Sequence, residues 1–180
     1  MKATGIVRRI DDLGRIVIPK EIRRTLHIRE SDPIEIFTDR EGQIVLRKYS
    51  PIGEMSTFAK QYAESLAKAS GHVAVITDKD LVIAVAGGGK HLLGKSVSRQ
   101  LEDKMQNRES VCAGREERAY VVVCENAEEY VYEAMAPIIC AGDVIGSVIL
   151  LSSEMKCKMG EVEQKLLQSA AGFLGRQMEQ

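Results

Sequence analysis

The chain has 180 residues and a net charge of −1, with 44% hydrophobic and 28% charged residues. This composition excludes a disordered chain and leaves room for one medium domain or two small ones. Charged side chains interrupt the N-terminal region, and uncharged runs such as residues 144–153 are too short to span a bilayer. We therefore expect a cytoplasmic protein with no membrane partner.

The cysteines and histidines form no pattern typical of a metal site or a disulfide framework. The cysteines are far apart and include no CxxC pair: Cys112, Cys124, Cys140 and Cys157. Two of them end apolar runs, where a reduced thiol behaves as a small hydrophobic group. The histidines are isolated from one another and from the cysteines: His27, His72 and His91. We expect no bound metal and no cofactor.

The small net charge conceals a difference between the two ends of the chain. Residues 1–29 contain eight lysines or arginines against three acids, so the rest of the chain is acidic. A basic segment ahead of an acidic one predicts that only the first part faces a polyanion such as nucleic acid.

Residues 1–50 predict a small β-β-α-β-β domain. Alternating apolar residues favour strands at 3–10 and 15–18, with the turn residues DDLG between them. A short helix over 19–27 starts at a proline, and a second hairpin joins 34–38 to 43–48. A domain of about 50 residues without a disulfide or a metal is marginal alone. We therefore expect a second copy of the chain to complete its core.

A linker at 51–55 contains Pro and Gly and separates this domain from a second one at 56–180. Apolar residues at helical spacing predict a helix that starts the second domain and ends at Gly71, another at 96–107, and a last one from about Gly160. The predicted strands are residues 72–77, 81–86, 119–124, 130–140 and 144–151. This order predicts an α+β domain with an antiparallel sheet flanked by helices.

The string GIVRRIDDLGRIVIPKEIRRTLHI, followed by DPIEIF, resembles the N-terminal DNA-binding domain of the AbrB family of transition-state regulators. The resemblance implies a dimeric barrel in which two chains exchange hairpins and share one core. It also implies that four arginines form the surface that contacts double-stranded DNA: Arg8, Arg15, Arg23 and Arg24. Two residues depart from the family pattern, because His27 and Ser31 stand where glycine is usual. If Ser31 needs a positive φ, the departure costs local stability and not DNA contact.

The residues themselves point the same way. Lys20 stands three and four positions before Arg23 and Arg24, so three like charges share one helix face and repel one another mildly. Phosphate binding accounts for such a cluster. The structural alternative is a solvated basic face near a helix C-terminus, with an acidic neighbour. Arg9 completes the candidate DNA-binding residues, although strand alternation turns it away from Arg8.

Residues 56–180 resemble a GAF domain through the strings HVAVITDKDLVIAVAG, HLLGKSVS and APIICAGDVIGSVILLS and the final helix GEVEQKLLQSAAGFLGRQMEQ. Motifs of the cyclic-nucleotide-binding and chromophore-binding GAF domains are missing. The arrangement of the whole chain resembles regulators of spore-forming bacteria that join an AbrB-type domain to a GAF-like one. The resemblance implies a non-enzymatic activator and repressor of sporulation genes. Its dimers form through residues 1–50, and the GAF-like domain assembles tetramers and binds a small-molecule signal.

Two alternative functions stay open from the sequence. Gly89, Gly94, Lys95 and Ser96 satisfy the phosphate-loop pattern GxxxxGK[ST], which indicates nucleotide binding. Such a loop needs a parallel sheet with long crossovers, whereas the strand before it closely follows another strand. The other alternative is a signal-binding GAF protein whose basic half is only a dimerisation arm.

Overall fold

The chain forms two compact units, residues 1–49 and 50–180. The computed structural model describes residues 5–54, 56–124, 127, 129–155 and 158–179. The predicted two-domain architecture is therefore confirmed, and each unit is described by itself.

The N-terminal unit contains one short helix and one hairpin. Helix α1 (Lys20–Thr25) begins directly after Pro19 and carries an acid in its first turn and arginines in its last, as the helix dipole favours. Strands β1 (Ile34–Thr38) and β2 (Ile44–Lys48) pair antiparallel, with Ile36 opposite Leu46. The predicted second hairpin is confirmed, and the helix is shorter than predicted.

The predicted first hairpin is wrong for the single chain, because the described residues 5–18 contain no strand. The chain does reverse where the turn residues stand: Gly14 N–H donates to the Asp11 carbonyl at 3.0 Å, and Asp11 N–H donates to the Arg15 carbonyl at 3.1 Å. Outside this turn, the described residues before and after it form no strand pairing with each other. Alternation gives each segment an apolar face, but a strand also needs a pairing neighbour.

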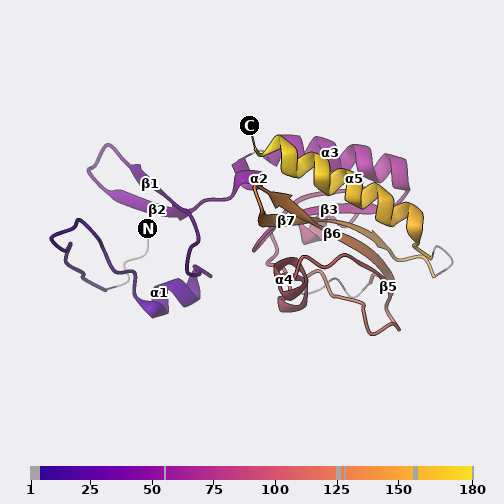
Figure 1. The fold of residues 1–180 in the computed structure, drawn as a ribbon, viewed down its shortest axis with the longest axis horizontal. Coiled ribbons are helices and arrows are strands. Elements are labelled where there is room, and N and C mark those ends of the chain that lie inside the picture. The colour runs from indigo at the N-terminus through magenta and orange to yellow at the C-terminus, as the bar shows by residue number, and fades with distance from the viewer. Residues whose placement is uncertain (1–4, 55, 125–126, 128, 156–157, 180) are drawn as a thin grey trace. The chain divides into compact units, whose positions relative to one another are not determined.

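The C-terminal unit is an antiparallel sheet with helices on both faces, as Figure 1 shows. Its strands lie in the order β4-β3-β7-β6-β5, and every neighbouring pair is antiparallel. The strands are β3 (Val73–Asp78), β4 (Val82–Ala86), β5 (Val111–Gly114), β6 (Tyr132–Cys140) and β7 (Asp143–Ser152). The helices are α2 (Pro51–Glu54), α3 (Ser56–Ser70), the 3-10 helix η1 (Lys90–Leu92), α4 (Arg99–Gln106) and α5 (Glu161–Gln177). The predicted α+β class is confirmed.

One predicted strand of this sheet is wrong. Residues 119–124 form no strand, and β5, which was not predicted, takes the edge beside β6. Val121 and Val123 are nevertheless buried, which explains the apolar alternation of the segment. Two backbone N–H groups of this segment bond to side chains and not to a neighbouring strand, since Val121 N–H donates to a carboxyl oxygen of Glu133 and Val122 N–H to the Gln100 side chain. The alternating pattern therefore reflects the burial of Val121 and Val123 and not membership of a strand.

The sheet separates two apolar cores. Helices α3 and α5 lie side by side over one face (Figure 1), where the fully buried side chains include Leu150 and Leu174. Helix α4 covers the other face, where Leu101 and Ile149 are buried. Helix α5 approaches β6 closely at Gly175, because a Cβ there would lie 2.1 Å from the Ile139 carbonyl oxygen.

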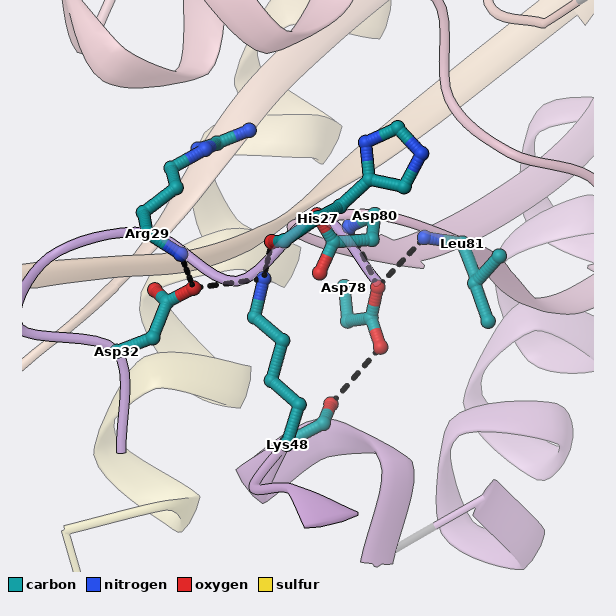
Figure 2. A network of polar contacts seen from close by, with 8 residues as sticks. His27, Arg29, Asp32, Lys48, Asp78, Asp80 and Leu81 are labelled. Carbon is teal, nitrogen blue, oxygen red and sulfur yellow. Dashed lines mark hydrogen bonds and ion pairs between the residues drawn. The ribbon is translucent and has the colours of Figure 1, made fainter. Parts of the chain in front are cut away.

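The segment expected as a linker, residues 51–55, overlaps helix α2, whose Ile52 is fully buried. Ser50, just before it, donates from its hydroxyl to the Asp78 carboxylate at 3.0 Å. The second view shows Asp78 in turn accepting the backbone N–H groups of Asp80 and Leu81, at 2.7 and 2.6 Å (Figure 2). These bonds fix the β3–β4 turn. In the described residues, no helix is long and apolar enough to cross a membrane.

Candidate nucleic-acid interface

The short helix α1 presents three basic side chains to solvent. Lys20, Arg23 and Arg24 are all exposed, and none forms an ion pair with a described residue. Their spacing of three and four residues places them along one side of the helix. Ile22 lies between them half-buried, so the helix has one side against the unit and a basic side toward solvent.

Arg15 is held by the turn that precedes it. The Asp11 carboxylate accepts the backbone N–H of Arg15 at 2.7 Å and of Leu13 at 3.1 Å, and it pairs with the Arg15 Nε at 2.7 Å. These contacts from Arg15, the backbone bond first, lower the pKa of Asp11, so its carboxylate is ionised at neutral pH. The Arg15 side chain stays 69% exposed, and its remaining N–H donors suit a phosphate. Asp11 was not among the predicted site residues, although an Asp that opens a turn was a signal for it.

Arg8 and Arg9 lie on the exposed segment before this turn. Arg8 donates to the neighbouring Val7 carbonyl at 3.3 Å. The six predicted residues therefore form two groups within one unit, three on α1 and three around the turn at Asp11. Alternation predicted opposite faces for Arg8 and Arg9, but both are exposed because their segment pairs with no strand here.

Both departures from the family pattern adopt the left-handed backbone expected of glycine. His27 has φ 51° and Ser31 has φ 66°, and the two residues flank the connection between α1 and β1. The end of α1 is nevertheless well bonded, because Ile28 N–H donates to the Arg23 carbonyl at 2.8 Å.

The C-terminal unit buries a carboxyl group on the α4 side of its sheet. Glu133 on β6 is 1% exposed and accepts a hydrogen bond from Val121 N–H. Burial raises the pKa of Glu133 to about 8, so the neutral acid predominates at pH 7. Elsewhere on this side of the sheet, the buried Thr77 and Ser147 hydroxyls bond each other at 2.7 Å. Cys112, Cys124 and Cys140 are free thiols, and Cys157 lies outside the described residues.

The phosphate-loop residues do not lie in a phosphate-loop setting. Gly89 precedes the 3-10 helix η1, Ser96 forms an isolated bridge with Leu81, and α4 begins only after Ser98. The sheet around them is antiparallel throughout. A phosphate loop instead connects a strand of a parallel sheet directly to the helix that follows it.

Comparisons with known proteins decide the family. Residues 54–179 match the family "Stage V sporulation protein T C-terminal, transcription factor". The chain is 52% identical over 183 aligned positions to stage V sporulation protein T of Bacillus subtilis (strain 168), with both chains fully covered. The chain belongs to the stage V sporulation protein T family. It is thereby a transcription regulator of the sporulation type, as predicted.

Further relatives match each of the two units separately. Residues 7–54 match "Antidote-toxin recognition MazE, bacterial antitoxin". The transition state regulatory protein AbrB of B. subtilis is 41% identical over 108 residues, which covers 60% of this chain and 93% of AbrB. The GAF domain of an Acinetobacter phosphoenolpyruvate-protein phosphotransferase superposes with a TM-score of 0.57 at 16% identity, covering 73% of this chain and 83% of that domain. The N-terminal unit is therefore AbrB-like, and the C-terminal unit has the GAF fold.

Proposed function

We propose that this regulator binds double-stranded DNA through the basic side chains of its N-terminal unit: Arg8, Arg9, Arg15, Lys20, Arg23 and Arg24. The observation that carries the proposal is that all six are exposed, while Asp11 orients Arg15 and leaves it 69% exposed. Contacts to phosphate supply most of the non-specific affinity of a protein for DNA. Because the arginines are few, we expect the protein to select DNA by its flexibility more than by contacts to individual bases. Activation and repression of sporulation genes then depend on where the protein binds.

Single Arg→Ala variants in the full chain test this interface. Each variant should bind DNA more weakly, and its plot of log affinity against log salt should be flatter by about 0.9 for each phosphate that it no longer neutralises. Gel shifts over a salt series measure both quantities. Arg40→Ala is the matched control, because Arg40 is an exposed arginine of the same unit, in the β1–β2 turn. Unchanged affinity in the Arg8, Arg15, Arg23 and Arg24 variants, with folding intact, contradicts the proposal.

We further propose that residues 1–50 act as a dimer with exchanged hairpins. The unit leaves many large apolar side chains exposed, among them Val7 (85%), Val17 (72%), Leu13 (70%) and Ile36 (67%). Burying such side chains is worth about 1.5–3 kcal/mol each, and a partner chain supplies both the cover and the missing strand neighbours. The same dimer brings two basic surfaces to one DNA segment. The functional boundaries at 1–50 and 56–180 are part of this proposal.

The outer side of α3 and α5 is the surface that we assign to tetramer assembly. Phe58 and Tyr62 on α3 meet Phe173 on α5, with ring centroids 6.1 and 5.5 Å from the Phe173 ring. Phe173 is 39% exposed, and Val162 on the same helix is 67% exposed. Sedimentation should show dimers for Phe173→Asp and tetramers for Gln168→Asp, an exposed control on the same helix. Tetramers in both variants contradict this assignment.

In this proposal the C-terminal unit assembles and senses without catalysis, and the protein works in the cytoplasm. A small-molecule signal bound there should raise the unit's melting temperature and, since coupling is reciprocal, change the DNA affinity of the full chain. ATP and GTP with magnesium serve as the comparison ligands. Magnesium-dependent nucleotide binding that is lost in Lys95→Ala would instead support the phosphate-loop alternative.

A further inference from the structure

The connection from α1 to β1 contains two side-chain-bearing residues in a conformation that normally requires glycine. His27 has φ 51° and Ser31 has φ 66°. The left-handed region is unfavourable for residues with a Cβ, so the surrounding structure must hold them there. The contacts that hold such a residue in this conformation therefore help to determine the path of the connection.

His27 occupies the left-handed position that ends α1. Its own N–H lies 3.4 Å from the Arg24 carbonyl, and the next residue, Ile28, donates to the Arg23 carbonyl at 2.8 Å. This pair of bonds is the Schellman arrangement, which depends on a left-handed residue just past the helix. The carbonyls that it engages belong to Arg23 and Arg24, two proposed DNA-contacting residues. The conformation of His27 therefore fixes the backbone that carries both arginines.

Lys48, at the end of β2, reaches across to this connection (Figure 2). Its Nζ donates to the His27 carbonyl at 3.0 Å and lies 3.0 Å from the Asp32 carboxylate. The same carboxylate oxygen accepts the Arg29 N–H at 2.8 Å. The Lys48 and Asp32 side chains are only 20% and 6% exposed. A largely shielded ion pair holds its geometry better than a surface pair.

We propose that Lys48 is a positioning residue for DNA binding: with Asp32 it holds His27 in the left-handed conformation, and so fixes the end of α1 for Arg23 and Arg24. The inference rests on the proposed DNA interface and assigns a role outside its six basic residues. Lys48 acts through α1 and not on phosphate, because its ammonium group already bonds two oxygens and its side chain is mostly covered. The Lys48–Asp32 pair thus stabilises a left-handed backbone conformation that a glycine at position 27 would adopt without strain.

A rescue experiment in the full chain separates positioning from direct contact. Lys48→Met removes this support of His27 and should lower DNA affinity by about tenfold, which corresponds to about 1.4 kcal/mol, because the strained residue is then no longer held in place. His27→Gly relaxes the strained position, so the double variant Lys48→Met/His27→Gly should recover most of the affinity and the wild-type salt slope. Lys60→Met, an exposed lysine of the C-terminal unit, is the control and should bind as wild type.

Two results overturn the proposal. One is wild-type affinity for Lys48→Met while Arg23→Ala and Arg24→Ala are weakened. The other is a double variant that stays weak with a lower salt slope, which makes Lys48 a direct phosphate ligand. If Arg23→Ala and Arg24→Ala also bind as wild type, the proposed interface itself fails. Should Lys48→Met not fold, Asp32→Asn with the same His27→Gly rescue repeats the test from the other side of the ion pair.

Discussion

The two units of this protein bury their apolar residues to very different extents. In the C-terminal unit, Leu150 and Leu174 are fully buried between the sheet and its helices. In the N-terminal unit, Val7 is 85% and Val17 is 72% exposed, and their segments form no strand. The C-terminal unit therefore buries a complete apolar core within a single chain. The N-terminal unit has enough apolar residues for a core, but a single chain leaves them exposed. We infer that DNA binding in this family member depends on association of chains, and that the C-terminal fold does not.

The largest expected change in stability comes from a substitution in the buried core of the C-terminal unit. Leu150→Ala should lower the free energy of unfolding of the C-terminal unit by about 2–5 kcal/mol, through reduced burial and the cavity left behind. Because this core lies within one chain, the loss should be the same at every protein concentration. Denaturant unfolding followed by tyrosine fluorescence measures it, since four of the five tyrosines are in this unit. A loss that disappears at high protein concentration would contradict a self-contained core.

A pH-dependent effect is expected from Glu133. Its pKa is raised from 4.5 to about 8 by burial, so stability is fully present below about pH 4.5 and declines as pH rises toward 8. At pH 7 the loss amounts to about 3 kcal/mol. Glu133→Gln stays neutral and keeps an oxygen for the Val121 N–H, so its stability should not decline over this range. Unfolding titrations at pH 5, 6, 7 and 8 compare the two, and parallel curves would contradict the burial of a neutral acid.

The smallest effects come from two glycines on one helix. A Cβ at Gly175 would lie 2.1 Å from the Ile139 carbonyl oxygen, whereas a Cβ at Gly172 meets nothing within 4 Å. Gly175→Ala should therefore cost about 1–3 kcal/mol through overpacking. Gly172→Ala should stabilise the unit by about 0.5–1 kcal/mol through helix propensity. Thermal unfolding of both variants is the measurement, and equal effects of the same sign would argue against the close approach of α5 to β6.

Sequence patterns predicted elements well where one chain contains both partners of an interaction. The hairpin of β3 and β4, the long helices α3 and α5, and strands β6 and β7 all followed from apolar spacing and turn residues. The prediction failed at residues 119–124, because N–H groups of that buried segment bond to the Glu133 and Gln100 side chains and not to the backbone of a neighbouring strand. Strand β5 escaped prediction because four residues are too short to show a period.

For the candidate interface, the exposed basic residues were predictable and their supports were not. Arg23 and Arg24 stand out by charge and spacing alone, and the family resemblance added Arg8 and Arg15. Lys48 lies in sequence far from the helix that it supports, and its hydrogen bond to the His27 carbonyl arises only when β2 folds beside the α1–β1 connection. Interactions of this kind depend on tertiary geometry that no local pattern encodes.

Hydrogen exchange of the backbone amides at 6–10 and 15–18 tests most directly the claim that a second chain completes the N-terminal unit. In the single chain these segments form no strand and offer little protection of their own. We predict slow exchange at protein concentrations where the full chain sediments as an oligomer, and faster exchange on dilution, with C-terminal protection unchanged. Rapid exchange of these amides at every concentration, in a protein that still binds DNA, would contradict the account.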